Sequence, residues 1–297
     1  MLMIFLDGVG IGSSNSQNNP FFKYHFKFLK DYFGEIPHLK RQHISKNNAF
    51  IFPVDACLGV PGIPLSGTGQ TSIFCGVNAP KLIGKHFGPF PYSTLIPVIK
   101  EKNIFKAFIQ KKLKADFVNA YPKIFFDYIN KGKKRLSVTS LSCLLSGIKL
   151  KGVTEVRRGK ALTAEIDNRR WVEKLNYNLP IIKPKTAAQR LLKLALINNF
   201  TLFEYFLTDH LGHGRISSEF EYVIQTLDDF LFFLLNNLPP NLTLIICSDH
   251  GNFEDLSTKS HTLNPALTIT AGKHAAYLSK KIKKLYHIKK AIMDIYS

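Results

Sequence analysis

Three short apolar segments of this 297-residue chain lead into aspartates, and this pattern constrains the fold most. Residues 1–6, 201–207 and 242–247 are apolar or β-branched runs, and Asp7, Asp209 and Asp249 follow them closely. Unbroken apolar runs of this length, bounded by turn residues, are typical of strands buried on both faces of a parallel sheet. Because the carboxyl ends of such strands meet at one sheet edge, we expect the three carboxylates to converge there.

A helix is predicted between the second and third of these strands. Apolar side chains recur at helical spacing from Phe220 to Leu234, and the helix should end near Asn236, before Pro239 and Pro240. Alternation of strands and helices favours an open α/β sheet. The expected fold class is therefore α/β, with an open, mostly parallel sheet flanked by helices and a small inserted cap domain.

The basic residues are concentrated in the middle of the chain. The net charge is +19, and residues 81–195 hold 25 Lys and Arg against 7 Asp and Glu. We expect residues 1–83 and 194–297 to form a discontinuous catalytic core, and residues 84–193 to form a basic cap. The charge has two open explanations, a solvated Lys-rich surface or a cap that attracts an anionic substrate. No nucleic-acid motif accompanies it, so no nucleic-acid partner is expected.

The composition also indicates a compartment. The longest apolar runs fall short of the roughly 20 residues that a membrane span needs. Residues 1–6 lack the basic flank of a signal peptide. The four cysteines, Cys57, Cys75, Cys143 and Cys247, form no CxxC pair. We therefore expect a reduced, cytoplasmic protein with no membrane partner.

Histidines accompany two of the aspartates. Asp209 and His213 are four residues apart, so one helical turn can direct both to one ion; Asp249 and His250 are adjacent, and His261 follows. Each pair alone is weak evidence, because an Asp-x-x-x-His pair is more often a surface pair than a metal site. Together, beside strand ends, they predict a metal site, and this mixture of ligands suits Zn, Mn or Fe.

A candidate nucleophile lies in the glycine-flanked segment Ser66-Gly67-Thr68-Gly69-Gln70. The apolar residues 73–74 that follow indicate that a helix begins here. A hydroxyl at a helix N-terminus faces backbone N–H groups that favour an anion, and a metal would activate it. The alternative is a helix cap with glycines for the turn. The neighbouring metal cluster favours the nucleophile.

These motifs together resemble the alkaline phosphatase superfamily, in its branch of cofactor-independent phosphoglycerate mutases and phosphopentomutases. The matching segments, in the family's order, are residues 6–8, residues 66–70 with Gly76, residues 209–213, residues 249–252, and residues 261–262 with Pro265. The resemblance covers residues 1–80 and 196–297 well and the middle poorly. The nucleophile motif of sulfatases, Cys/Ser-x-Pro-x-Arg, does not occur in the sequence.

The resemblance implies two divalent metal ions, most simply Mn or Zn. One ion would be held by Asp209, His213 and His261, and the other by Asp7, Ser66, Asp249 and His250. Ser66 occupies the family's nucleophile position and would form a phosphoserine, with Thr68 as its rival.

The resemblance also implies phosphoryl transfer on a small phosphorylated metabolite. Phosphomutase activity (an isomerase) is favoured, and a metal-dependent phosphatase or phosphodiesterase (a hydrolase) is the alternative. The chain is too short for the large inserted domain of the phosphoglycerate mutases, so a different substrate is expected. Arg157, Arg158 and Lys85 are the candidate substrate contacts, because guanidinium and ammonium groups bind phosphate. A catalytically silent protein that binds anions or nucleic acid is a less favoured hypothesis.

Overall fold

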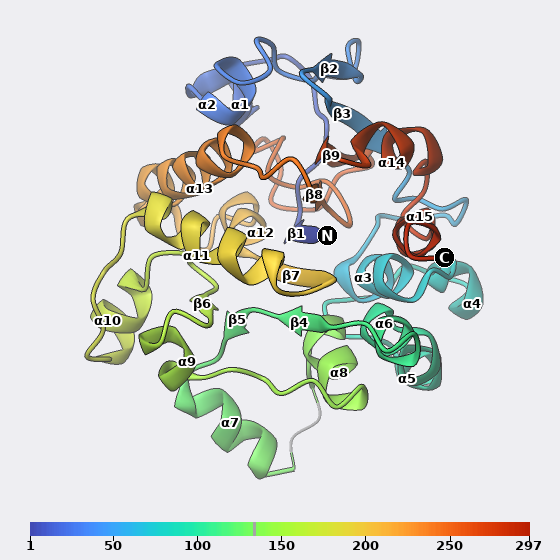
Figure 1. The fold of residues 1–297 in the computed structure, drawn as a ribbon. Helices are drawn as coiled ribbons and strands as arrows, with labels where there is room; N and C mark the ends of the chain where they lie inside the picture. The colour runs from blue at the N-terminus through green and yellow to red at the C-terminus, as the bar shows by residue number, and fades with distance from the viewer. Residues whose placement is uncertain (133–134) are drawn as a thin grey trace.

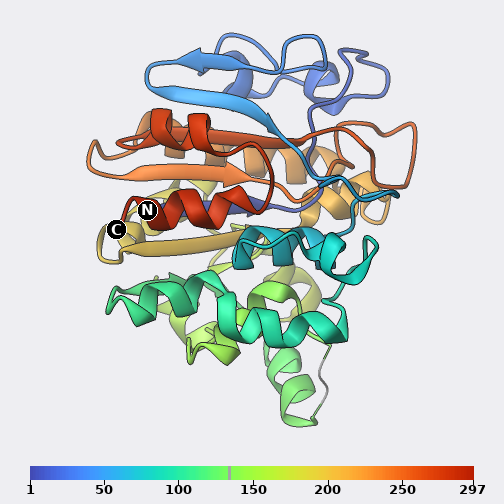
Figure 2. The same cartoon turned by 90° about the vertical axis from the view of Figure 1, so that its right-hand side faces the viewer.

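The computed structural model describes residues 1–132 and 135–297 and has a central β-sheet with helices on both faces (Figures 1 and 2). The strands are β1 (Leu2–Leu6), β2 (Ile44–Lys46), β3 (Ala49–Val54), β4 (Ala115–Phe117), β5 (Asn119–Ala120), β6 (Leu162–Thr163), β7 (Phe200–Tyr205), β8 (Thr243–Cys247) and β9 (Ala266–Gly272). The helices are α1 (Pro20–Lys23), α2 (Lys27–Lys30), α3 (Ser66–Cys75), α4 (Ala79–Ile83), α5 (Ile96–Lys102), α6 (Ile104–Gln110), α7 (Lys123–Asn130), α8 (Val138–Leu145), α9 (Val153–Arg157), α10 (Arg169–Leu175), α11 (Pro184–Leu196), α12 (Leu207–Gly212), α13 (Phe220–Asn236), α14 (Ala275–Lys281) and α15 (His287–Asp294). No helix among the described residues combines the length and apolar character that crossing a bilayer requires.

The main sheet of the described residues has seven strands in the order β2-β3-β9-β8-β1-β7-β4. β8, β1, β7 and β4 run parallel to one another, whereas β9 pairs antiparallel with β8, β3 with β9, and β2 with β3. The three apolar segments of the sequence are β1, β7 and β8, side by side in the centre of the sheet. The expected fold class, a mostly parallel α/β sheet flanked by helices, is confirmed.

Each central strand is buried on both faces because its successive side chains point to opposite sides of the sheet. In β1, Leu2 and Ile4 pack in one core with α2, α11 and α13, while Met3 and Phe5 pack in a second core with α3, α5, α6, α8, α14 and α15. Figure 1 shows α11 and α13 on one side of the strands, and α3, α14 and α15 on the other. The continuous apolar runs in the sequence reflect this two-sided burial.

The element boundaries follow the sequence expectations to within two residues. α13 spans Phe220–Asn236 as predicted. β7 ends at Tyr205, two residues before the predicted end, because Leu207 begins the short helix α12. α3 begins at Ser66, so the predicted helix after the glycine-flanked hydroxyl is present.

Part of the basic middle segment belongs to the sheet layer. β4 extends the sheet beside β7. The rings of Phe105 and Phe108 in α6 lie 5.8 and 4.9 Å from the ring of Phe200 in β7. This strand could not be predicted from the sequence, because β4 has only three residues and Asp116 interrupts its apolar pattern. The boundaries of a cap at residues 84 and 193 stay a prediction.

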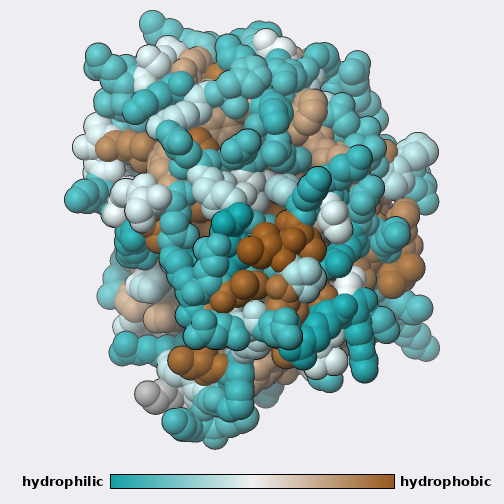
Figure 3. Space-filling view, turned by 90° about the vertical axis from the view of Figure 1, so that its left-hand side faces the viewer, coloured by the Kyte–Doolittle hydropathy of each residue, from teal (hydrophilic) through white to brown (hydrophobic). Residues whose placement is uncertain are grey.

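The later part of the middle segment has a small core of its own, made of Ala120, Val156, Ala161, Trp171 and Leu179. Its members come from β5, α9, α10 and the segments that follow these two helices, and these elements lie toward the lower left of Figure 1. The side of the molecule that carries α10 and α11 shows an apolar patch near its centre, ringed by hydrophilic side chains (Figure 3).

The two-sided core makes β1 sensitive to truncation. Phe5 is fully buried, and its ring lies edge-on, 5.8 Å from the ring of Phe74 in α3. We expect Phe5→Ala to lower the free energy of unfolding by about 3–5 kcal/mol, because it removes apolar contacts and leaves a cavity. Urea unfolding measures this. Leu82→Ala is the control: Leu82 is 59% exposed, so its truncation should change the free energy by no more than about 0.5 kcal/mol.

Candidate active site

The three aspartates meet at the carboxyl edge of the central strands. Asp7 directly follows β1, and its backbone N–H donates to the carbonyl of Tyr205 at the end of β7 (2.9 Å). Asp249 lies two residues beyond β8, and Asp209 lies in α12, the first helix after β7. The backbone N–H of Gly8 is 3.4 Å from the Asp249 carboxylate. The expected convergence is therefore present.

The three histidines join the aspartates in a single cluster. Nε2 of His250 is 3.4 Å from Oδ1 of Asp7 and 3.5 Å from Oδ2 of Asp249. Nε2 of His213 and Nε2 of His261 are 3.3 and 3.4 Å from the two oxygens of the Asp209 carboxylate. The imidazoles of His250 and His261 stack with their ring centroids 3.7 Å apart, so the two halves of the cluster are in contact.

The other nitrogen of each imidazole faces a main-chain carbonyl. Nδ1 of His213 lies 2.6 Å from the carbonyl oxygen of Lys259, and Nδ1 of His261 lies 2.8 Å from that of Pro64. Nδ1 of His250 lies 3.3 Å from the carbonyl oxygen of Gly251. A proton on each Nδ1 satisfies these carbonyls and leaves each Nε2 with a lone pair. Nε2 of His213 and Nε2 of His261 are only 3.1 Å apart, so either a proton shared between them or a bound cation has to separate the two lone pairs. This arrangement orients histidines in metal sites.

The donor set fits divalent cations. Two groups of ligand atoms lie close enough to hold an ion: Asp209, His250 and His261 form one, and Asp7, Asp249 and His250 the other. Oδ1 of Asp7 and Oδ2 of Asp249 are buried without a hydrogen-bond partner. Buried carboxylate oxygens are costly unless they are paired or coordinate a metal. Cations at these two places would supply the missing partners.

The electrostatics of the cluster point to the same need for positive charge. Burial, reinforced by the charge of Asp209, raises the pKa of Asp249 to about 7. Burial and the charge of Asp249 raise the pKa of Asp7 well above its ordinary value. Burial opposes ionisation of Asp209 too, but hydrogen bonds from His261 and Asn252 and the nearby imidazoles outweigh it and hold the pKa of Asp209 below its ordinary value. Burial lowers the pKa of His250 to about 3, so this ring is neutral and able to bind a metal.

Ser66 lies at this cluster and Thr68 does not join it. Oγ of Ser66, in the first turn of α3, is 3.0 Å from Nε2 of His250. The hydroxyl of Thr68 donates to main-chain carbonyls, those of Leu65 (3.1 Å) and Phe87 (3.3 Å). The Thr68 side chain is fully buried in this role. Of the two rival hydroxyls, Ser66 is the one that faces the imidazoles.

A glycine lets α3 approach the cluster so closely. A Cβ atom at Gly69 would lie 2.8 Å from Cβ of Asp249 and 3.1 Å from its carbonyl oxygen. Any side chain at this position would therefore push α3, and Ser66 with it, away from the strand edge. The glycine at position 69 is thus explained by the close approach of α3 to Asp249.

Glu254 is a structural residue of the site that sequence reasoning missed. It is 1% exposed. One carboxylate oxygen accepts from the backbone N–H groups of Gly10 (2.7 Å) and Asn252 (2.8 Å), and the other accepts from the hydroxyl of Thr262 (2.5 Å) and the side-chain amide of Asn264 (3.0 Å). Glu254 thereby ties the loop that follows β1 to the long loop between β8 and β9, and holds the part of that long loop that carries His261. The one feature of the sequence that could have indicated this role is the position of Glu254, five residues after the expected ligand Asp249.

The expected substrate contacts lie outside this cluster. Arg157 and Arg158 are exposed at the end of α9, where Nη2 of Arg157 donates to the carbonyl of Asn178 (3.4 Å). Nζ of Lys85 lies over the rings of Phe87 and Tyr92. Within the described residues none of the three bonds to the cluster, so their contact with substrate stays a prediction.

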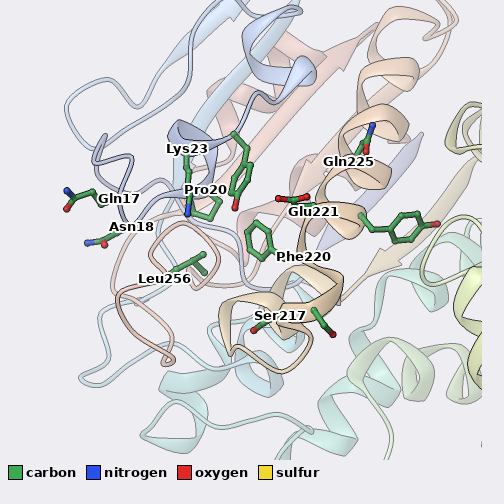
Figure 4. Close-up of a pocket in the computed structure, with 12 residues that line it drawn as sticks. Gln17, Asn18, Pro20, Lys23, Ser217, Phe220, Glu221, Gln225 and Leu256 are labelled. Carbon is green, nitrogen blue, oxygen red and sulfur yellow. The ribbon is translucent and has the colours of Figure 1, made fainter.

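A large pocket of about 700 Å³ lies elsewhere, between residues 17–24 and the start of α13 (Figure 4). Its labelled side chains, among them Lys23, Phe220 and Glu221, project around an open groove. None of the seven expected metal ligands lines it. The expected metal ligands therefore lie at the strand edge and not in this groove.

Comparison with known proteins agrees with this geometry. The family model of the Metalloenzyme superfamily matches residues 174–296, which include Asp209, His213, Asp249, His250 and His261. No curated protein matches the chain in sequence.

Solved structures share the fold. A protein from Pyrococcus horikoshii is 13% identical, with 99% of this chain and 95% of that one covered and a TM-score of 0.57. A cold-active alkaline phosphatase from Shewanella sp. is 10% identical, with both chains fully covered and a TM-score of 0.54. The family match over the second half of the chain and the fold shared with these two proteins agree with the resemblance at the level of the superfamily.

The role of Glu254 can be tested by a nearly isosteric change. In Glu254→Gln the amide oxygen can keep the backbone N–H groups of Gly10 and Asn252, and the amide NH₂ then faces Thr262 and Asn264, whose hydroxyl and side-chain amide must turn to accept from it. We expect the free energy of unfolding to fall by about 1–3 kcal/mol, because the buried donors lose a charged acceptor. Urea unfolding checks the stability, and metal analysis after dialysis should show reduced metal content. Glu35→Gln is the control, because the Glu35–Arg41 ion pair is exposed.

The pKa of Asp249 predicts a pH-dependent cost in the metal-free protein. Between about pH 4 and 7 the folded chain keeps a proton that the unfolded chain has lost, so the stability contributed by Asp249 falls as the pH rises over this range and levels off above about 7. Asp249→Asn cannot ionise. In chelator, we expect its melting temperature to gain on that of the wild type between pH 5 and pH 8. An equal difference at both pH values would contradict this electrostatic account.

Proposed function

We propose that the chain is a di-metal-dependent phosphoryl-transfer enzyme that acts on a small phosphorylated metabolite. The observation that carries the proposal is the cluster of three aspartates and three histidines around the hydroxyl of Ser66. The family match over the cluster's carboxyl-terminal members and the alkaline-phosphatase-like fold support it. The exposed basic residues of the middle segment would attract the anionic substrate.

Two groups of side chains would hold the cations. We assign Asp209, His213 and His261 to one ion and Asp7, Ser66, Asp249 and His250 to the other. Bound divalent cations, Mn or Zn, would supply an activated hydroxyl and positive charge for the phosphoryl oxygens. Nδ1 contacts with main-chain carbonyls fix the orientation of the imidazoles.

Ser66 is the proposed nucleophile. Its Oγ attacks phosphorus as the bond to the leaving oxygen breaks, which leaves a phosphoserine at the N-terminus of α3. The partial positive charge of a helix N-terminus favours the phosphate there. Thr68 is the weaker candidate, because main-chain carbonyls already hold its hydroxyl.

The phosphoserine can react in two ways. Transfer to another hydroxyl of the same substrate makes the enzyme a phosphomutase, whereas transfer to water makes it a phosphatase. The residues of the motifs resemble those of the phosphomutase branch more than those of the phosphatases, so a phosphomutase is favoured and a phosphatase is the alternative. Arg157, Arg158 and Lys85 remain the proposed contacts of the basic segment with the substrate phosphate or a carboxylate. A cytoplasmic location also remains a proposal.

The nucleophile is tested with a panel of sugar and glycerate phosphates and Mn-loaded protein. Released phosphate and isomerised product are both measured, for the wild type, Ser66→Ala and Thr68→Val. We expect Ser66→Ala to lose at least about 1,000-fold in kcat, since removal of a nucleophile is among the largest effects in catalysis. Thr68→Val should keep its activity within about tenfold, as expected of a structural hydroxyl.

Two further results would change the proposal. Full activity of Ser66→Ala, or loss confined to Thr68→Val, would exclude Ser66 as the nucleophile. Absence of any turnover with bound metal present would favour the silent anion-binding protein. Salt-dependent retention on DNA that chelation leaves unchanged would favour nucleic-acid binding by the basic segment.

A further inference from the structure

The helix α3 carries a buried amide that the proposed mechanism does not use. Gln70 lies one helical turn after Ser66 and is 4% exposed. Its Oε1 is buried without a hydrogen-bond partner. Because an unpaired buried acceptor lowers the stability of a protein, its presence beside the candidate nucleophile calls for an explanation.

Two contacts of α3 show which way Gln70 faces. Side chains four residues apart lie on one face of a helix, so Ser66, Gln70 and Phe74 share a face. Oγ of Ser66 is 3.0 Å from Nε2 of His250. The ring of Phe74 lies 5.8 Å from the ring of Phe5 in β1. Gln70 lies between these two contacts and therefore faces the carboxyl end of β1.

Asp7 is the polar residue at that end of β1. It follows Phe5 by two residues, and its backbone N–H continues the hydrogen bonds between β1 and β7, so both side chains point to the same side of the sheet. Oδ1 of Asp7 is 3.4 Å from the Nε2 of His250 that Ser66 also contacts. Like Oε1 of Gln70, this oxygen is buried without a hydrogen-bond partner. Two unpaired acceptors therefore occur in the same part of the site.

An amide can resolve this arrangement because it carries donors as well as an acceptor. A half-turn of the amide exchanges Oε1 and Nε2 of Gln70, and Nε2 presents two N–H donors. Helical side chains tilt toward the N-terminus of their helix, so the amide lies over the turn that begins at Ser66. Carboxylates that bind metals are themselves hydrogen-bonded by neighbouring groups, and Asp7 is an expected ligand that lacks such a partner.

We propose that Gln70 is a positioning residue: in the metal-bound protein, its amide N–H donates to the carboxylate of Asp7 and holds that ligand in place for its cation. The inference rests on the metal assignment of the proposed function and adds an outer partner to it. Gln70 bonds to no reacting atom, so it acts through Asp7 alone.

Binding of Mn²⁺ to the full-length metal-free protein tests this assignment without turnover. Gln70→Met keeps the length of the side chain and removes its hydrogen-bonding groups. By isothermal titration calorimetry, we expect this variant to bind one of its two Mn²⁺ ions about 10–100-fold more weakly, the range that loss of an outer partner causes. In chelator the variant should melt no lower than the wild type, because Oε1 has no partner to lose.

Thr201→Val is the matched control. Thr201 is fully buried in β7, and its Oγ1 also lacks a hydrogen-bond partner. It pairs with Leu2, at the end of the sheet away from the metal ligands. The control therefore removes a buried unpaired polar atom at a distance from the site, and both Mn²⁺ affinities should stay unchanged.

Two backgrounds identify the ion that Gln70 serves. Asp7→Ala keeps the ligands of the other ion, so adding Gln70→Met should leave the remaining Mn²⁺ affinity unchanged. His213→Ala keeps the ligands of the ion that Asp7 binds, and there Gln70→Met should weaken the remaining affinity by the factor seen in the parent protein. An equal loss in the Asp7→Ala background would overturn Asp7 as the partner.

Gln70→Asn provides a second variant if Gln70→Met does not fold. It keeps the amide but shortens the side chain by one methylene group, so we expect weaker Mn²⁺ binding again. A metal-free Gln70→Met protein that melts well below the wild type would overturn the proposal, because the amide would then already serve the fold.

The outcomes separate this inference from the proposed function. Unchanged Mn²⁺ affinity in Gln70→Met, with weaker binding of inorganic phosphate to the Mn-loaded variant, would assign the amide to the phosphoryl group and overturn its role toward Asp7. Turnover that depends on Ser66, together with unchanged Mn²⁺ and phosphate affinities in Gln70→Met, would overturn the inference and leave the enzyme in place. The expected Mn²⁺ affinities in a protein that turns over no phosphate ester would support the inference and overturn only the enzyme.

Discussion

The accumulation of negative charge at one sheet edge is the constraint on which the rest of the structure depends. Asp7, Asp209 and Asp249 are delivered there by three adjacent parallel strands or the helix that follows, and two of their oxygens are buried without a hydrogen-bond partner. Imidazole lone pairs face the same space. Such a site is costly by itself and becomes favourable when cations occupy it. Cations bound at these candidate groups would therefore stabilise the folded chain as well as supply positive charge to the site.

The surrounding residues keep this unfavourable cluster in place. Glu254 joins the loop after β1 to the long loop between β8 and β9 through four hydrogen bonds, and the main-chain carbonyls of Pro64 and Lys259 orient two of the imidazoles. Gly69 lets α3 approach the strand edge so that Ser66 reaches His250. Because these supports are buried and hydrogen-bonded, they hold the ligands at fixed positions, which phosphoryl transfer requires more than any reactive group of the protein.

In the proposed function, the phosphoryl group would lie in a site whose cations neutralise it. The middle segment contributes to the surroundings of this site. Its early residues extend the sheet through β4, while its later residues, around Trp171, form a small core of their own.

The sequence by itself determined the central strands, the class of fold and the seven residues that converge at the strand edge. Their signals are local: unbroken apolar runs that mark two-sided burial, and aspartates placed where such runs end. Only the tertiary structure revealed the antiparallel strands β2, β3 and β9 beside the parallel core, the place of β4 in the sheet, and the hydrogen bonds by which Glu254 holds the loops of the site. These features depend on contacts between segments far apart in the chain. The sequence around a glutamate does not show whether its side chain is buried, and the groups that it bonds to are set by the segments that fold around it.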